Sequence, residues 1–345
     1  MTRHTPPPSS VLRADPDAPV VVGLSNPGDV VSSVPALLGY RPTHSVVLIL
    51  LGGPRRRVEL TMRVDLPEGG DPRRWVRVGA ALVPGATASG ADEAILVLID
   101  ADMATGREAA NHLGPVLVDL GISLADALVV FDERYASVLC SDPECCPTEG
   151  RLVPGGSAVA AAAVVTGRVI RDTRDELGAE IAPPDRSQSA ASDRVATRLA
   201  ASIQHGRIDL SIEAVDERLD RACATTPEDD LRLEQAVELA LMVAAGEIRD
   251  QAYLHLLDAG AERHRAVWAA VCRQVPERLS VVPLVLFALS AYLLGDGAVA
   301  NVALDRALQL DERHPSVRLL GDLLAAGIPP AAIRAALTRC VVDED

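Results

Sequence analysis

Hydrophobic residues in the first half of the chain occur as short continuous runs or at every second position. Residues 45–51 are an apolar run of strand length, which predicts a strand buried on both faces. In residues 57–66 apolar side chains alternate with polar ones, which predicts a half-buried strand paired with the first as a hairpin. Residues 94–99 predict a further buried strand, and 127–131 with 134–139 predict a second hairpin.

Segments with an apolar residue at every third or fourth position lie between these strands. They predict helices over 29–38, 71–83 and 105–120. Gly39 and Gly121 follow the first and the third of them, at the position where helices commonly end. Because helices and strands alternate along the chain and some strands are joined as hairpins, we expect an α/β layered domain with a mixed sheet.

The second half of the chain has a different pattern, since from residue 157 onward only helical periods remain, separated by glycine or proline. The expected helices are 157–177, 229–245, 247–258, 261–274, 281–294, 297–310, 315–326 and 330–340. The expected regions are a disordered lead-in at 1–19, an α/β domain at 20–182 that includes a cysteine-rich loop at 140–150, a linker at 183–192 and an all-α domain at 193–345.

One expected helix pair resembles a tetratricopeptide repeat. The packing positions of that motif are occupied by Leu284, Phe287, Ala288, Ala300, Leu304 and Ala307. Glu312 replaces the usual proline of the motif, and an ordinary helical hairpin with small residues at its contact explains the same pattern. Arrays of such repeats bind peptides or proteins in a groove, so we expect the helical domain to dock a partner protein.

Composition narrows the classes of function. Hydrophobic residues make up 48% of the chain, aromatic residues only 2%, and 48 acidic against 33 basic residues give a net charge of −15. This acidity argues against a nucleic-acid or anionic-lipid partner, because both require a basic surface. The longest apolar stretch, 281–294, is too short to cross a bilayer and is interrupted by Pro283, and residues 1–19 lack the apolar core of a signal peptide. We therefore expect a cytoplasmic protein without a membrane partner.

The strongest candidate for chemistry is a cluster of thiols. Cys140, Cys145 and Cys146 lie within seven positions, in a loop directly after a predicted strand. Thiolates are good zinc ligands, so the first interpretation is a zinc site. A structural zinc site has four ligands, and His44 and His112 are the nearest candidates in the α/β half for the missing one.

Two other interpretations of the loop stay open. Cys140 and Cys145 can form a redox-active disulfide, whereas the adjacent Cys145 and Cys146 are too close for an unstrained one. Alternatively, the three thiols are small hydrophobic side chains that pack a tight loop against the sheet. The cysteines on predicted helices are far apart in sequence, and we expect them to pack in the core.

Carboxylates collect where the predicted strands end. Asp65 with Arg63, and Asp100 with Asp102, can line a cleft at the edge of the sheet and hold Mg²⁺. Aspartate is also common at strand ends because it starts turns and caps helices, which is the alternative explanation.

Asn26 and Asp29 begin the first helix, whose N-terminus can hold an anion such as a small phosphorylated ligand. Asp29 itself would repel a phosphate, and the chain contains neither of the glycine-rich nucleotide-binding motifs.

Several blocks of residues resemble a known family. They are 34–47, Arg63 to Pro67, the cysteine block ending at 145–150, and 167–177. Together they are similar to the actinobacterial domain of unknown function DUF4192, over about residues 20–336. The family often carries tryptophan near Tyr135, where this chain has Ala136. The resemblance implies the fold and a bacterial cytosolic protein, and it implies no activity.

These observations favour a non-enzymatic binding or regulatory protein with a helical domain that docks a partner. The alternative is a metal- or thiol-dependent enzyme that uses Cys140, Cys145 and Cys146 with the strand-end aspartates as acid, base or ligand. The chain has no complete set of catalytic residues in any familiar spacing.

Overall fold

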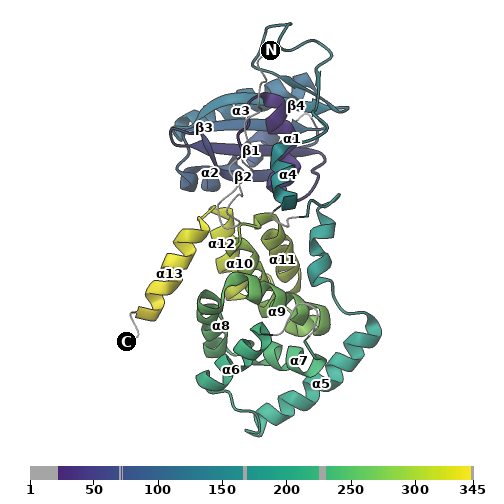
Figure 1. The fold of residues 1–345 in the computed structure, drawn as a ribbon, viewed down its shortest axis with the longest axis vertical. Helices are drawn as coiled ribbons and strands as arrows, with labels where there is room; N and C mark the ends of the chain where they lie inside the picture. The colour runs from purple at the N-terminus through teal and green to yellow at the C-terminus, as the bar shows by residue number, and fades with distance from the viewer. Residues whose placement is uncertain (1–21, 70, 72, 166–168, 225–230, 343–345) are drawn as a thin grey trace, which may run out of the picture.

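The computed structural model describes residues 22–69, 71, 73–165, 169–224 and 231–342 (Figure 1). The lead-in expected at 1–19 lies outside these residues. An α/β half is followed along the chain by a helical half, and the two are stacked along the long axis of the molecule (Figure 1). The predicted fold class, an α/β domain followed by helices, is confirmed.

A six-stranded mixed sheet forms the centre of the α/β half. Its strands are β1 (Ser45–Gly52), β2 (Arg57–Asp65), β3 (Glu93–Ile99), β4 (Ser123–Phe131), β5 (Arg134–Ser137) and β6 (Arg151–Leu152). They lie in the order β2-β1-β3-β4-β5-β6, with β3 and β4 parallel and the other neighbours antiparallel. The predicted hairpins are β1–β2 and β4–β5, whereas the short β6 has no counterpart among the predicted strands.

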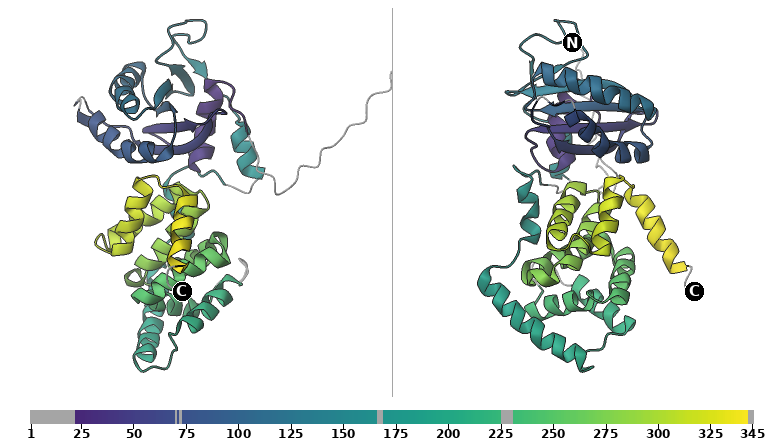
Figure 2. Two further views of the ribbon diagram at one scale, coloured as in Figure 1. Left: turned by 90° about the vertical axis from the view of Figure 1, so that its left-hand side faces the viewer. Right: turned by 180° about the vertical axis from the view of Figure 1, so that it is seen from behind.

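Helices cover both faces of the sheet (Figure 2). On one face lie α2 (Arg73–Ser89) and α3 (Met103–Asp119), and on the other lies α1 (Pro27–Leu38). Every residue of β1 is buried, as its apolar run predicts. Successive side chains of a strand point to opposite faces, so Leu48 packs with α2 and α3 and Ile49 packs with α1.

The predicted helix 71–83 continues as α2 through Pro84 to Ser89. Its buried face runs past the proline, with Leu82 before it and Ala86 after it. Burial of this face outweighs the backbone hydrogen bond that a proline inside a helix removes.

After β6 the described residues form no further strand of the sheet. The first helix there, α4 (Ala158–Val165), packs against α1 and belongs to the α/β half (Figure 1). The helical half consists of the 3₁₀ helix η1 (Asp175–Ile181), α5 (Arg186–Gln204), α6 (Ile212–Cys223), α7 (Leu233–Met242), α8 (Gly246–Ala259), α9 (Ala261–Gln274), η2 (Glu277–Leu279), α10 (Val281–Leu293), α11 (Gly297–Leu310), α12 (Pro315–Ala325) and α13 (Pro330–Val342). From α8 onward the α-helices agree with the predicted bounds to within about two residues, which is the usual uncertainty of helix ends.

The predicted hairpin of helices is formed by α10 and α11. The six residues that suggested a tetratricopeptide repeat are all buried there. Residues 282–293 of α10 are buried around the whole helix, which is expected of a helix at the centre of a core.

Two expectations between the halves need correction. The helix expected over 157–177 ends at Val165 among the described residues, and a 3₁₀ helix begins only at Asp175. The stretch 183–192, expected as a linker, is helical from Arg186 onward. The cause is a capping box, in which Asp185 Oδ1 accepts from the Gln188 amide at 2.9 Å and the Gln188 side chain accepts from the Asp185 amide at 3.0 Å.

The two halves share buried surface. One cluster of buried side chains runs from the α1 face of the sheet through η1 into the helical half. The turn after α12 also meets α2 backbone to backbone, since a Cβ on Gly327 would lie 2.9 Å from the Cα of Gly85. Gly327 has a φ of +61°, so this contact requires both the absence of a side chain and a left-handed backbone.

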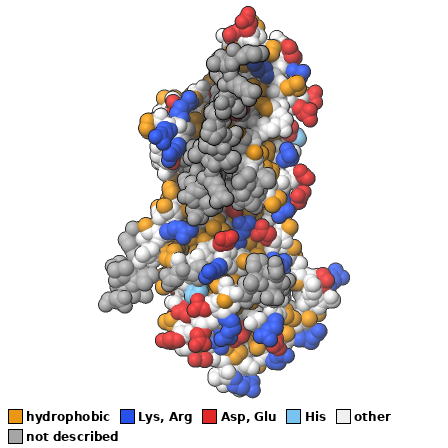
Figure 3. Space-filling model, viewed as in Figure 1, with side chains coloured by type: hydrophobic (Ala, Val, Ile, Leu, Met, Phe, Trp, Pro, Cys, Tyr) orange, Lys and Arg blue, Asp and Glu red, His pale blue; other side chains and the backbone are white. Residues whose placement is uncertain are grey.

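No helix in the described part of the chain has both the length and the apolar character to cross a bilayer. On the face shown in Figure 3, arginine and acidic side chains are interspersed over the helical half. The net negative charge is therefore not gathered there into one acidic surface.

Candidate metal site

The cysteine loop connects β5 to β6, and local hydrogen bonds fold it back on itself. At its start, the Ser137 hydroxyl donates to Asp126 Oδ1 at 2.6 Å and accepts from the Cys140 amide at 3.2 Å. Further along, the Cys146 amide donates to the carbonyl of Asp142 at 2.7 Å. These bonds turn the chain between Cys140 and Cys146, so that the part of the loop after β5 and the part before β6 lie side by side.

Two arginines of the short strands β5 and β6 bind the second part of the loop, residues 144–150. Arg151 donates through Nε to the carbonyl of Cys145 and through Nη2 to that of Glu144 at 2.8 Å. Arg134 donates to the carbonyl of Gly150 at 2.9 Å. Because Arg134 and Arg151 belong to β5 and β6, the edge of the sheet positions the loop.

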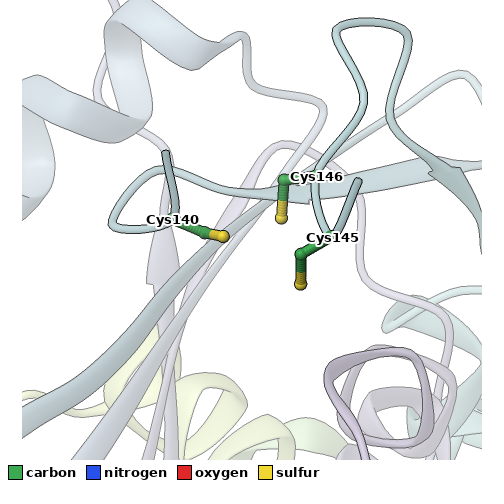
Figure 4. Close-up of side chains that lie close together, drawn as sticks. All are labelled: Cys140, Cys145 and Cys146. Carbon is green, nitrogen blue, oxygen red and sulfur yellow. The ribbon is translucent and has the colours of Figure 1, made fainter. Parts of the chain in front are cut away.

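The result is a cluster of three thiols. The Sγ atoms of Cys140, Cys145 and Cys146 all lie within 4.8 Å of one another (Figure 4). Three sulfurs around a tetrahedral zinc, with Zn–S of about 2.3 Å, are about 3.8 Å apart. The sulfurs are therefore at a spacing that a small shift of the loop would bring to metal-binding distance.

The environment keeps a metal-free thiol protonated at Cys146. Burial raises the pKa of this thiol, and the neighbouring thiols Cys140 and Cys145 raise it further, while a hydrogen bond with the Ser137 backbone opposes them. This is the reverse of an activated cysteine, whose pKa is lowered by positive neighbours. A cation at the centre of the cluster would favour the thiolates and release their protons.

The described part of the chain places no fourth ligand beside the three thiols. Cys145 is exposed and the other two cysteines are half-buried. Among the described residues, no histidine or carboxylate joins these cysteines in a group with mutually close ligand atoms. The two histidines suggested by the sequence have other contacts, since His44 Nδ1 lies 3.3 Å from Asp100 and His112 Nδ1 lies 2.8 Å from the carbonyl of Glu108.

Asp65 and Asp100 lie at the same end of the sheet, because Asp65 and Ile99 are both register partners of Ser45. The strand-end side chains nevertheless have separate partners. Arg63 forms an ion pair with Asp65 at 2.6 Å. Asp100 accepts from the His44 amide at 2.8 Å. Asp102 caps α3 by accepting from the Thr105 amide, and that hydrogen bond lowers its pKa. These contacts are an ion pair, a hydrogen bond between two segments and a helix cap, and the described residues show no metal-capable group that contains these aspartates.

The start of α1 is occupied by its own side chains. Asn26 Oδ1 accepts from the Asp29 amide at 3.0 Å, as an N-cap does. The Asp29 carboxylate accepts from the Ser25 amide at 2.8 Å and from the Asn26 side chain at 3.0 Å. A carboxylate therefore lies where an anionic ligand would bind.

The structure also brings together residues that the sequence did not single out. Cys223, His255 and His264 have ligand atoms within 4.8 Å of one another, and all three are buried. They come from α6, α8 and α9, and no short motif links them. Only the packing of the three helices brings them into contact, so a single sequence contains no local signal for this group.

The fold and the loop define a class of protein: a mixed α/β sheet domain, joined to an array of helices, with a three-thiol loop at one sheet edge. The family described as "Domain of unknown function (DUF4192)" matches residues 27–331, and the chain belongs to this family. Comparison with curated proteins and with solved structures gives no match.

Proposed function

We propose that this protein is a non-enzymatic, cytoplasmic binding protein whose loop holds Zn²⁺ through Cys140, Cys145 and Cys146. The mutual approach of the three sulfurs within 4.8 Å is the observation that supports it. Three thiolates on Zn²⁺ leave a fourth position, and the exposure of Cys145 leaves that position accessible. A side chain of a partner protein, such as histidine, cysteine or carboxylate, is the ligand that would complete it. Thiols of an exposed loop also stay reduced in the cytoplasm, as zinc binding requires.

The helical half is the proposed docking surface for this partner. Leu308 on α11 and Leu319 on α12 are large apolar side chains that remain exposed, Leu319 to 63%. Cover by a partner would remove this apolar surface from water, which favours association. Because buried side chains connect the two halves, the test is a point variant, Leu319→Glu, rather than a truncation. A protein that copurifies with the wild type and is lost from Leu319→Glu at unchanged zinc content supports docking, and identical copurification contradicts it.

Metal content tests the zinc site directly. The wild type, Cys145→Ser/Cys146→Ser and Cys272→Ala are purified untagged under reducing conditions and measured by mass spectrometry. Cys272 is a buried thiol of α9 and serves as the matched control. We expect about one zinc per chain in the wild type and in the control, as a single site requires, and none in the double variant. Equal zinc in all three proteins, or none in any, contradicts the proposal.

Co²⁺ substituted into the loop reports its ligands through its absorption spectrum. A change of this spectrum on addition of imidazole would show that the fourth position is open to an external ligand. An open position is required both for a partner's side chain and for a substrate, so a test of activity must follow. The enzyme alternative further requires an acid or base beside the metal, and Asp65 and Asp100 are engaged with Arg63 and His44. Hydrolysis of model esters by the zinc form, lost in the double variant, would favour the enzyme instead.

A further inference from the structure

Three helices of the helical half converge on one buried polar group. Cys223 ends α6, His255 lies on α8 and His264 lies on α9. Their exposed fractions are 9%, 7% and 0%, and their ligand atoms lie within 4.8 Å of one another. Buried histidine and cysteine from separate helices at this distance form a donor set of the kind that binds soft metal ions.

Hydrogen bonds fix the proton on each imidazole. Trp268 Nε1 is a donor only, and it lies 3.1 Å from Nδ1 of His264. His264 therefore carries its proton on Nε2 and donates it to Nδ1 of His255 at 2.9 Å. His255 in turn carries its proton on Nε2, which lies 3.2 Å from Asp220 Oδ1. This series of hydrogen bonds runs from the core to the surface, since the Asp220 side chain is exposed.

Burial keeps His264 and Cys223 uncharged at neutral pH. Burial lowers the pKa of His264 to about 4 and raises the pKa of Cys223 to about 11. A bound ion must therefore keep the site close to neutral, because an uncompensated charge in a core is costly. A monovalent ion with one thiolate has no net charge, whereas Zn²⁺ with one thiolate leaves a positive charge. Zn²⁺ also needs a fourth ligand, and none joins these three among the described residues.

We propose that Cys223, His255 and His264 form a three-coordinate site for Cu(I). The metal binds Sγ of Cys223, Nδ1 of His255 and Nε2 of His264. One Cu(I) enters and the Cys223 thiol proton leaves, while the Nε2 proton of His264 moves to its Nδ1 and ends the bond from Trp268. His255 keeps its Nε2 proton toward Asp220, the arrangement in which a carboxylate orients a metal-bound histidine.

The experiment uses the full chain with the loop thiols removed. In Cys140→Ser/Cys145→Ser/Cys146→Ser, Cu(I) is titrated anaerobically from its bicinchoninate complex, whose absorbance falls as the protein takes the metal. We expect one Cu(I) per chain and a change in tryptophan fluorescence, because Trp268 loses its acceptor. Adding Cys223→Ala weakens binding at least about 100-fold, since loss of a ligand exceeds the 10–100-fold effect of its outer partners. Adding Cys272→Ala, which removes a buried thiol outside the group, leaves binding unchanged.

A second measurement needs no ligand variant. X-ray absorption of the Cu(I)-loaded triple-serine protein is expected to show one sulfur and two nitrogen donors. Absence of stoichiometric binding, equal affinity in the Cys223→Ala protein, two or more sulfur donors, or tighter binding of Zn²⁺ than of Cu(I) would each overturn the proposal. If circular dichroism shows that Cys223→Ala does not fold, the donor count decides. Because the loop thiols are absent throughout, the result is independent of the zinc proposal.

Discussion

The described part of the molecule contains two groups of metal-capable side chains with thiols, and they are built in opposite ways. Cys140, Cys145 and Cys146 are neighbours in sequence and are arranged by backbone hydrogen bonds of one exposed loop. Cys223 and its two histidines come from three helices and meet only inside the core. The first group can therefore change without unfolding the protein, whereas the second is part of what holds the helices together.

Acid should affect the buried group most strongly. The pKa of His264 falls from 6.5 to about 4 on folding, because burial disfavours its charged form. When the pH falls below 6.5, the unfolded chain binds a proton that the folded chain does not. Stability present above pH 6.5 is then lost as the pH falls toward 4, by about 3 kcal/mol for the metal-free protein.

Urea denaturation between pH 7.5 and 4 measures this loss, with His112→Gln as the control. His112 is exposed, so this variant should lose stability with acid as the wild type does. His264→Gln should start less stable and lose less. An equal acid loss in His264→Gln and the wild type would show that His264 does not contribute.

The contribution of the hydrogen bond from Trp268 to His264 to the free energy of unfolding should be measurable by comparing substitutions of the two tryptophans. Trp268→Phe leaves Nδ1 of His264 without its donor. Trp75 is equally buried, but its Nε1 has no hydrogen-bond partner among the described residues, so Trp75→Phe reduces packing and the contact of the ring with the Arg74 guanidinium but breaks no hydrogen bond. We expect Trp268→Phe to cost about 2 kcal/mol more in the free energy of unfolding, the range for a buried polar atom left unpaired. Equal costs would show that the bond contributes nothing.

The contact between the two halves should respond to a single methyl group. Gly327→Ala places a Cβ 2.9 Å from the Cα of Gly85 and on a left-handed backbone. Gly39→Ala is the matched control, because Gly39 has a φ of +79° but no atom within 4 Å of the added Cβ. Each variant has the cost of left-handed backbone, about 1 kcal/mol. Gly327→Ala should exceed the control by about 1 kcal/mol in thermal or urea unfolding because of the overlap. Similar values would mean that the contact relaxes freely.

The loop should show the smallest effect on stability. In metal-free protein, Cys145→Ser/Cys146→Ser is expected to change the free energy of unfolding by less than about 0.5 kcal/mol, as surface substitutions usually do. Cys223→Ser, which places a hydroxyl in the core, should cost more. A large loss in the loop variant would mean that the loop is part of the core and not a separate site.

The sequence predicts the parts of this structure that depend on neighbouring residues. The apolar run of β1, the alternation in β2 and the helices from α8 to α13 follow from local periodicity. The capping box at Asp185 was also present in the sequence, but the prolines before it and the serines after it suggested a linker. Its pattern of Asp followed three residues later by Gln is the signal that should have decided for a helix.

The candidate sites divide along the same line. The three loop cysteines were found because they are close in sequence. The buried group was not found, because His255 and His264 lie nine positions apart on two different helices and Cys223 lies on a third helix. For the strand-end aspartates the reverse holds. Their positions at the ends of the strands were predicted, but their ion pairs and caps depend on side-chain geometry that periodicity does not specify.

The meeting of Gly85 and Gly327 has a consequence for how the chain is made. A ribosome releases α2 long before it synthesises the turn that covers Gly85, and the α1 face of the sheet is likewise packed against helices that emerge later. The N-terminal half therefore leaves the exit tunnel with apolar surface that no earlier segment can cover. Completion of the fold must await the release of the segment that contains Gly327, and slowed synthesis of the helices before it should increase the demand for chaperones.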